Sequence, residues 1–402
     1  MIENFYRKRQ RSGLMTDKEL MEILELGEDS KIQFKKIFNS PDSLAAEIGA
    51  FANSEGGRIL VGVNDNGEII GLTKNEIARY NQMISNVCSQ KIEPSISVTT
   101  QNIKCGDKIV MVISVPIGSN KFYMSNGSDI WVKVGADKRR AKREELRRLL
   151  QESSQLYADE QPVEGTSTKD LNMFEVEDFL ENKMGLEYSK MAISVENILK
   201  NMKLMHDGKC TLGGLLLFGK KSNFELRLYY IAAVSWFGND IAGVEYRESE
   251  NIYGSIPILF LEGLAFIKRQ LKKTQEGQDF NSLGILEIPE IALKEALVNA
   301  IIHRNYFIVS NIRILVFDNR IEIISPGALP NTLDVESIKL GAKIPRNPIL
   351  LSYIENLKDI PFRGVGSGIP RIIKSCKDAG IKVDFINCKE GPGQFKVIFW
   401  RK

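Results

Sequence analysis

The chain has 402 residues, of which 43% are hydrophobic and 26% charged, so it is long enough for two to three soluble domains of roughly 150 residues each. Its five cysteines are scattered without a CxxC pair and it has two histidines, which argues against a disulfide framework and a Cys/His zinc site and favours a reducing cytoplasm. The formal net charge of +3 is too small to predict a nucleic-acid partner by itself, so the distribution of charge matters more than its sum.

The first segment of the chain is basic and polar. Cations cluster at 7–11 without an apolar stretch of the kind found in signal peptides. Thr16 is suited to cap a helix over 17–26. The longest apolar runs of the chain, such as 256–261, are too short to cross a bilayer. We therefore expect a basic helical arm and no membrane partner.

Residues 30–151 show the patterns of a compact α+β domain. The expected elements are a strand at 30–38, a helix at 44–53, a hairpin made by RILVGV and EIIGL, a helix at 74–90, strands at 95–103 and 108–116, a strand pair within 122–134, and a helix over 138–148. The turn between RILVGV and EIIGL is Asn-Asp-Asn-Gly, a sequence typical of hairpins. This domain is expected to end near Gln151.

Two segments of this domain, IQFKK and AFANSEGGRILVGVNDNGEIIGL, resemble the Schlafen-type AlbA domain, a fold associated with DNA or RNA binding and in some members with RNA cleavage. Cleaving members carry Glu, four residues, then Glu-Phe-Lys. Here Glu28 fits the first position, but Gln33 stands at the second, and an amide does not replace a carboxylate that neutralises a metal or accepts a proton. Asp65 is a candidate third acid, or simply a turn residue. The resemblance implies nucleic-acid binding, with a metal-dependent ribonuclease as the alternative.

Basic residues gather near the end of the same domain, after the aromatic residues 122, 123 and 131. The candidate phosphate-binding cations are Lys35, Lys36, Lys138, Arg139, Arg140, Lys142 and Arg143. Such cations position nucleic acid without reading its sequence. The alternative is a solvated amphipathic helix whose acidic residues offset the charge. We expect DNA or RNA as the partner.

Polar residues with little periodicity fill 152–169 and predict a linker. Beyond it, we expect helices at 175–183, 195–202 and 254–273 and buried strands at 212–218 and 226–236. No catalytic residues stand out in 170–284, which we interpret as a connecting domain. Its sequence TLGGLLLFGKK resembles the connecting region of bacterial helicase-related regulators.

The last domain, 285–402, is organised around a helix at 291–306. Glu295, Asn299 and His303 are each four residues apart and share a face of this helix. Mg²⁺ accepts an amide oxygen as a ligand, and a carboxylate can orient or deprotonate an attacking water. Strands follow at 311–317 and 320–325, with Gly327 after the second. This face is therefore the candidate catalytic surface.

A glycine cluster, Gly364, Gly366 and Gly368, stands before an expected helix at 369–379 and closing strands at 382–386 and 394–400. Glycines allow backbone N–H groups to approach a ligand closely, and a helix N-terminus favours phosphate oxygens. A helix carrying a carboxylate and an amide, together with such a loop, indicates a nucleotide site.

These pieces, with Arg-Asn-Pro at 346–348, resemble the GHKL-type ATP-binding domain shared by gyrase, MutL and histidine kinases, and most closely its branch in bacterial helicase-related regulators. The resemblance implies that Asn299 holds Mg²⁺ and that Glu295 handles the hydrolytic water. It places His303, Gly327 and the three loop glycines at the nucleotide. The aspartate that reads adenine in related domains is not visible in 324–327.

The fold expected for the whole chain is α+β and multidomain: an AlbA-like domain at 1–151, a linker at 152–169, an α/β connecting domain at 170–284 and a GHKL-like α/β sandwich at 285–402. We expect a cytoplasmic transcriptional regulator that binds nucleic acid, uses ATP and Mg²⁺, and hydrolyses ATP weakly or not at all. The alternatives are a ribonuclease of Schlafen type and a non-catalytic defence or interaction scaffold. The sequence contains no GxxxxGK[ST] phosphate-binding loop, so it gives no support to a helicase activity. Dimerisation is common in both resembled families, but no heptad demands it.

Overall fold

A computed structural model describes residues 15–153, 156–183, 185, 193–274, 284–330, 333–357, 360, 362, 366–391 and 393–401. The basic cluster at 7–11 and the glycine at 364 lie outside these residues. The chain forms two compact units, Met1–Leu156 and Tyr157–Lys402, which we call the N-terminal and the C-terminal unit. Each is described by itself.

The N-terminal unit is built on a four-stranded sheet of order β1-β2-β5-β4, in which β1 runs parallel to β2 and the other neighbours are antiparallel. Its elements are α2 (Asp17–Leu26), β1 (Ile32–Lys35), α3 (Pro41–Asn53), β2 (Gly57–Val61), α4 (Lys74–Asn86), a π-helical turn (Val87–Lys91), β3 (Ile92–Glu93), β4 (Thr99–Cys105), β5 (Lys108–Val115), β6 (Met124–Ser125), β7 (Trp131–Val134), β8 (Asp137–Arg140) and α5 (Arg143–Glu152).

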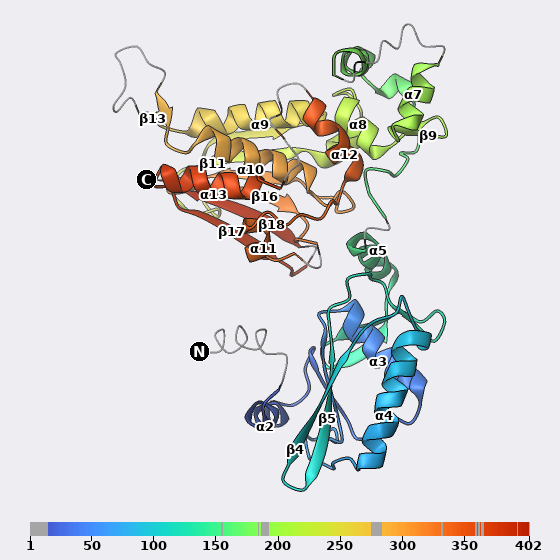
Figure 1. Cartoon of the computed structure of the whole chain (residues 1–402). Helices are drawn as coiled ribbons and strands as arrows, with labels where there is room; N and C mark the ends of the chain where they lie inside the picture. Colours follow the sequence, from blue (N-terminus) through green and yellow to red (C-terminus); the bar gives the residue numbers. More distant parts are fainter. Residues whose placement is uncertain are drawn as a thin grey trace. The chain divides into compact units, whose positions relative to one another are not determined.

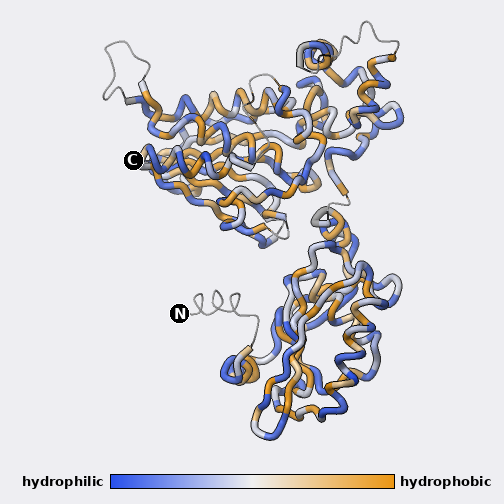
Figure 2. The backbone as a smooth tube through the Cα atoms, viewed as in Figure 1, coloured by the Kyte–Doolittle hydropathy of each residue, from blue (hydrophilic) through white to orange (hydrophobic). Residues whose placement is uncertain are grey.

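Helices cover both faces of this sheet (Figure 1). Ile59 and its alternate neighbours pack against α3 and α4, whereas Leu60 packs with Leu20 of α2, since successive strand residues point to opposite faces. Thr16 forms a capping box at the start of α2, as its position predicts. Apolar residues therefore fill both sides of the sheet, and the hydropathy colouring of Figure 2 shows them on these strands and helices.

Three local expectations for this unit differ from the structure. The segment EIIGL forms one bridge, Val63 to Ile69, instead of a strand. The pair expected within 122–134 forms as a single bridge, Ser125 to Asp129, whereas β6 itself pairs with β3 and β7 with β8. Residues 138–140, expected in a helix, lie in β8, because Gly135 at φ +60° allows a tight turn after β7. The basic segment is therefore half strand and half helix.

The C-terminal unit contains a six-stranded sheet of order β12-β11-β15-β16-β18-β17, with β11 parallel to β15 and the remaining neighbours antiparallel. Its helices and longer strands are α6 (Met173–Asp178), α7 (Val195–Asn201), α8 (Leu212–Phe218), β11 (Ile231–Trp236), β12 (Tyr246–Ile252), α9 (Ile256–Gln270), α10 (Glu290–Ile302), β15 (Ile312–Val316), β16 (Arg320–Pro326), α11 (Val335–Lys339), α12 (Pro348–Tyr353), α13 (Gly368–Asp378), β17 (Val383–Cys388) and β18 (Gln394–Trp400).

Shorter elements complete this unit: two-residue strands pair as β9 (Met205–His206) with β10 (Lys209–Cys210) and as β13 (Lys273–Thr274) with β14 (Ile285–Leu286). Helices α9, α10 and α13 lie side by side over the sheet (Figure 1). Among the described residues, no helix is long and apolar enough to cross a membrane.

The six-stranded sheet crosses the boundary expected at 284–285, because β11 and β12 come from the expected connecting segment and pair with strands that follow it. The segment expected as a linker also contributes to this unit: Asp159 is fully buried and accepts a hydrogen bond from the backbone N–H of Leu350 at 3.0 Å. The polar composition of 157–169 thus reflects an ordered, hydrogen-bonded segment.

Residues 212–218, expected as a buried strand, form helix α8, which corrects that prediction. Thr211 caps the helix by accepting a hydrogen bond from the N–H of Gly214, and every residue of α8 is buried. A short apolar run that is buried all round has no distinguishing periodicity. The expected strand 226–236 is likewise shorter, since 225–229 form a 3₁₀ turn before β11.

Candidate nucleotide pocket and nucleic-acid interface

Glu295, Asn299 and His303 lie along one side of α10 and line a single pocket of the C-terminal unit, as their four-residue spacing predicts. The helix ends at Ile302, so His303 is its C-cap residue. Apolar side chains from β16, β18 and the segments around α11 and α12 complete the walls. An apolar pocket with a few convergent polar groups is the usual form of a small-molecule site.

The carboxylate of Glu295 is almost fully buried and forms an ion pair with Arg371 of α13, with 2.5 Å between Oε1 and Nη1. Burial raises the pKa of Glu295, and the charge of Arg371 opposes this shift. Arg371 also donates from Nη2 to the hydroxyl of Ser367 in the glycine loop. The candidate base is therefore tied to the loop through a basic side chain that the sequence analysis did not single out.

Asn299 presents an amide whose nitrogen is buried and, in the described part of the chain, has no hydrogen-bond partner. The glycine loop covers this group closely: a Cβ on Gly368 would lie 3.0 Å from Asn299 Nδ2 and 2.9 Å from Glu295 Oε2. A side chain at position 368 would therefore force Glu295 or Asn299 to shift, so glycine allows the loop backbone to lie close to both. Helix, loop and carboxylate thus converge at one point.

Two other predicted glycines also sit where a side chain would clash. Gly366 adopts φ +75°, and a Cβ there would lie 2.6 Å from the carbonyl oxygen of Gly341. Gly327 adopts φ +99°, and its Cβ would meet Arg346 Nη1 at 2.8 Å. Both backbones are in the region that favours glycine. Gly364, the third loop glycine, lies outside the described residues.

The Arg-Asn-Pro segment secures the end of α10. Arg346 donates to the carbonyl of His303 at 3.2 Å and to that of Ala328 at 2.7 Å. Asn347 is fully buried and donates to the carbonyls of Ile302 and Arg304 at 2.8 and 2.9 Å. These bonds satisfy carbonyl groups that a helix end leaves without partners. The segment therefore fixes the position of His303 at the pocket.

His303 is held as a neutral imidazole. Burial lowers its pKa to about 4, and the nearby charges of Arg346 and Lys343 act in the same direction. A neutral imidazole donates from one nitrogen and accepts at the other. At neutral pH His303 can thus bind a ligand by hydrogen bonds but brings no positive charge to a phosphate.

Ser325 stands two residues before Gly327, in the segment where related domains carry an adenine-reading aspartate. Its buried hydroxyl donates to the carbonyl oxygen of Ala300 on α10 at 2.7 Å. With its proton committed, the hydroxyl oxygen presents only acceptor capacity to the pocket it lines.

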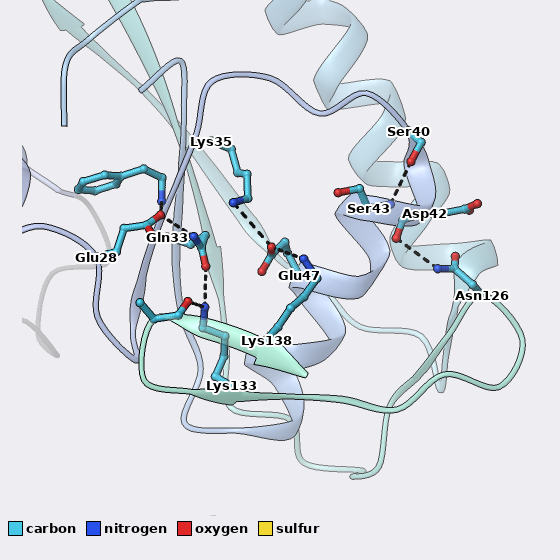
Figure 3. Close-up of polar contacts among 12 residues, drawn as sticks. Glu28, Gln33, Lys35, Ser40, Asp42, Ser43, Glu47, Asn126, Lys133 and Lys138 are labelled. Atoms are coloured by element: carbon cyan, nitrogen blue, oxygen red, sulfur yellow. Dashed lines mark hydrogen bonds and ion pairs between the residues drawn. The ribbon is translucent and has the colours of Figure 1, made fainter. Parts of the chain in front are cut away.

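In the N-terminal unit, the position of the nuclease-type acids holds a hydrogen-bonded amide (Figure 3). Glu28 Oε1 accepts from Gln33 Nε2 at 2.5 Å and from the N–H of Phe34 at 2.6 Å. Gln33 Oε1 in turn accepts from Lys133 Nζ at 2.6 Å. Burial lowers the pKa of Lys133, while the charges of Glu47 and Glu28 oppose the shift. An ammonium group thus lies beside the position at which the cleaving relatives carry their second carboxylate.

A second cluster in Figure 3 surrounds Glu47 of α3, which is 2% exposed. Lys138 Nζ lies 2.5 Å and Lys35 Nζ 3.9 Å from Glu47 Oε1. Two of the predicted phosphate-binding cations are therefore engaged with a buried carboxylate. No pattern in the sequence distinguishes Glu47, since it stands within an apolar helical stretch.

The remaining predicted cations divide into paired and exposed ones. Arg139 forms a bidentate pair with Glu145 at 2.8 Å, and Arg140 pairs with Asp129 at 3.0 Å and lies over the ring of Trp131. The exposed cations in and around α5 and β1 are Lys31, Lys36, Lys142, Arg143, Arg147 and Arg148. A phosphate group in solution can therefore reach the exposed cations more readily than the paired ones.

Asp65, the candidate third acid, is exposed in the turn that begins at Asn64, whose carbonyl accepts from the N–H of Gly67 at 3.0 Å. Within the described ranges of the chain, no three His, Cys, Asp or Glu side chains gather as a possible metal site. The structure therefore agrees with the interpretation of Asp65 as a turn residue.

Three family models match separate parts of the chain. Residues 28–142 match "Schlafen, AlbA_2", residues 147–232 match a domain of unknown function, DUF8451, and residues 310–399 match "Putative ATP-dependent DNA helicase recG C-terminal". The resemblances of the N-terminal domain to the AlbA domain and of the last domain to the ATP-binding domain of helicase-related proteins are thereby confirmed. Among curated proteins, none matches the chain significantly.

Two solved structures are similar in part. The DIP2311 protein from Corynebacterium diphtheriae is 18% identical with a TM-score of 0.44, and the match covers 93% of this chain. The chain spans 65% of the length of that protein. The N-terminal domain of a "Putative ATP-dependent DNA Helicase RecG-related Protein" from Nitrosomonas europaea is 22% identical with a TM-score of 0.22, covering 26% of this chain and 74% of that one.

Proposed function

Because the chain combines a Schlafen AlbA_2 domain with a recG-type C-terminal domain, we propose that it is a nucleic-acid-binding regulator whose C-terminal unit binds a nucleotide, ATP with Mg²⁺. The observation that carries the nucleotide assignment is the convergence of Glu295, Asn299 and Gly368 in an apolar pocket, since a Cβ built on Gly368 would lie within 3.0 Å of both side chains. This juxtaposition places a carboxylate, an unpartnered amide and a close backbone at one point.

The residues present suit a magnesium-bound nucleotide. Asn299 would supply the amide oxygen that holds Mg²⁺ beside phosphate oxygens and water, and the nitrogen of the same amide has no hydrogen-bond partner in the described structure. When bound, Mg²⁺ would neutralise charge on the phosphates. His303 and Ser325 would contact the nucleoside, and Gly366 and Gly368 would let the loop backbone approach the phosphates.

Isothermal titration of ATP with Mg²⁺ tests this site. The wild type and Asn197→Ala, which removes an exposed helical amide of the same unit, should show saturable binding. Asn299→Ala should bind at least about tenfold more weakly, since the loss of one good polar interaction with a charged ligand amounts to roughly 1.5 kcal/mol or more. If none of the three proteins binds ATP, the nucleotide assignment is refuted and the scaffold alternative is favoured.

The nucleic-acid assignment places the phosphate contacts on Lys142, Arg143 and Arg147, which are exposed in and before α5. Fluorescence anisotropy with labelled DNA and RNA at several salt concentrations tests it. Replacing these three cations with neutral residues should reduce the steepness with which the logarithm of the association constant falls with the logarithm of the salt concentration. The reduction should be up to about 0.9 for each duplex phosphate that the variant no longer contacts. The matched control neutralises three exposed lysines on other elements of the unit, Lys18, Lys74 and Lys104. An equal decrease of the slope in both triple variants would refute this interface.

A ribonuclease is the weaker candidate. Lys133 and Gln33 occupy the region where cleaving relatives need acids, and an ammonium group there repels a divalent cation. Incubation of RNA with the protein and Mn²⁺ separates the two functions, because cleavage that disappears in Glu28→Gln would assign a nuclease despite this arrangement.

A further inference from the structure

Arg371 stands one turn into α13, directly behind the glycine loop, and faces the nucleotide pocket. Its guanidinium contacts Glu295 through Nη1 and the Ser367 hydroxyl through Nη2. The side chain of Arg371 is 30% exposed, whereas that of Glu295 is 4% exposed. The arginine is therefore the accessible partner of the pair and the carboxylate the covered one.

Among the described residues that line the pocket, the cations are Lys343, Arg346 and Arg371. His303 is neutral because burial lowers its pKa to about 4, and Asn299 supplies an unpartnered amide but no charge. Arg346, the other arginine that lines the pocket, is engaged with the carbonyls of His303 and Ala328. The guanidinium of Arg371 contacts Glu295 at 2.5 Å, beside the point where Gly368, Glu295 and Asn299 meet.

A terminal phosphate group attracts a guanidinium more strongly than a single carboxylate, because it carries more negative charge. Resting on the nucleotide site proposed above, we propose that Arg371 recognises the terminal phosphate of a nucleoside triphosphate by exchanging Glu295 for it. Arg371 thereby distinguishes a triphosphate from a diphosphate, and the exchange leaves the Glu295 carboxylate without its cation.

The exchange has a chemical consequence for hydrolysis. While paired with Arg371, Glu295 is a poor base, since a nearby cation stabilises its ionised form. Once released into its buried site, it can accept the proton of a water whose oxygen bonds to the terminal phosphorus as the bond to the bridging oxygen breaks and the diphosphate departs. The base is thus available only when a terminal phosphate holds the arginine.

The most discriminating test is Glu295→Gln, measured by titration of ATP and of ADP with Mg²⁺. Competition for Arg371 predicts that this variant binds ATP about fivefold more tightly than the wild type, since a partly exposed ion pair changes an equilibrium constant by up to roughly that factor. ADP affinity should change little, and ATP hydrolysis should be abolished. A purely structural ion pair predicts weaker binding of both nucleotides, and that result would overturn the proposal.

Arg371→Ala and Arg371→Lys provide the complementary test. Alanine should bring the ATP and ADP affinities close together, and lysine should fall between alanine and wild type because it keeps the charge but loses the planar fork. Lys374→Ala, an exposed cation on the same helix, is the control and should retain the preference for ATP. Circular dichroism checks that each variant is folded.

Two failures remain distinguishable in these titrations. If the wild type binds neither nucleotide, the proposed function and this inference fall together. If the wild type binds both nucleotides but Arg371→Ala weakens them equally, the nucleotide site stands and the role of Arg371 as the phosphate-recognising residue is refuted.

Discussion

We expect the free energy of unfolding of the C-terminal unit to depend on pH through Asp159. Its side chain is fully buried, its Oδ2 accepts from the N–H of Leu350 in the first turn of α12, and its Oδ1 has no partner among the described residues. Burial is the main cause that raises its pKa from 3.8 to about 7, and the charge of Glu160 adds to it. The folded protein therefore keeps a proton that the unfolded chain releases near pH 4.

This shift makes the unit lose stability as pH rises. The stabilisation is fully present below the unfolded pKa near 4 and is lost as pH rises through the folded pKa near 7. Asp159→Asn preserves the oxygen that accepts from Leu350 but cannot titrate. Between pH 5 and pH 8, the free energy of unfolding of the wild type should fall by roughly 3 kcal/mol relative to this variant, at about 1.4 kcal/mol for each pH unit up to the folded pKa.

Urea unfolding at pH 5, 6, 7 and 8 measures the difference. In a Trp131→Phe background, the remaining tryptophans, Trp236 and Trp400, report on the C-terminal unit. Asp240→Asn is the matched control, because Asp240 is exposed and also accepts a backbone N–H, from Ala242 at 2.9 Å. If the difference in the free energy of unfolding between the wild type and Asp159→Asn stays constant with pH, the reasoning is refuted.

Three further predictions concern the two candidate sites. Gln33→Glu alone should give no Mn²⁺-dependent RNA cleavage in a gel assay, because Lys133 Nζ, 2.6 Å from Gln33 Oε1, would neutralise the new carboxylate. Gly368→Ala should weaken ATP binding by about tenfold or more in titration, because its Cβ would lie 3.0 Å from Asn299 Nδ2; unchanged affinity would exclude the loop from the site. Asn347→Ala should destabilise the C-terminal unit by about 1–3 kcal/mol in urea unfolding, because two buried carbonyl groups lose their donor.

Local patterns predicted the elements that bear the sites. The apolar spacing of 291–301 placed Glu295 and Asn299 on α10, and Thr16 marked the start of α2. These features depend on residues within one or two helical turns of each other, so they can be recognised in a single sequence. The same reasoning failed for 212–218, where burial on all sides removes the periodicity that separates helix from strand.

The partners of the site residues could not be predicted in this way. Arg371 reaches Glu295 across 76 positions of the chain, and Lys133 reaches Gln33 across 100. No spacing rule connects residues that far apart, since only the packing of α13 on α10 and of β7 near β1 brings them together. The basic cluster after Trp131 shows the same limitation, because the carboxylates that pair with Lys138 and Arg139 became visible only in the fold.

Both units share one arrangement of charge at their candidate sites. In the C-terminal unit Arg371 covers the carboxylate of Glu295, and in the N-terminal unit Lys138 covers that of Glu47. A buried carboxylate with a basic partner is neither a free metal ligand nor a strong base. A polyanion that bound the partner cation would compete with the carboxylate for it, so the same charge exchange is open to test in both units.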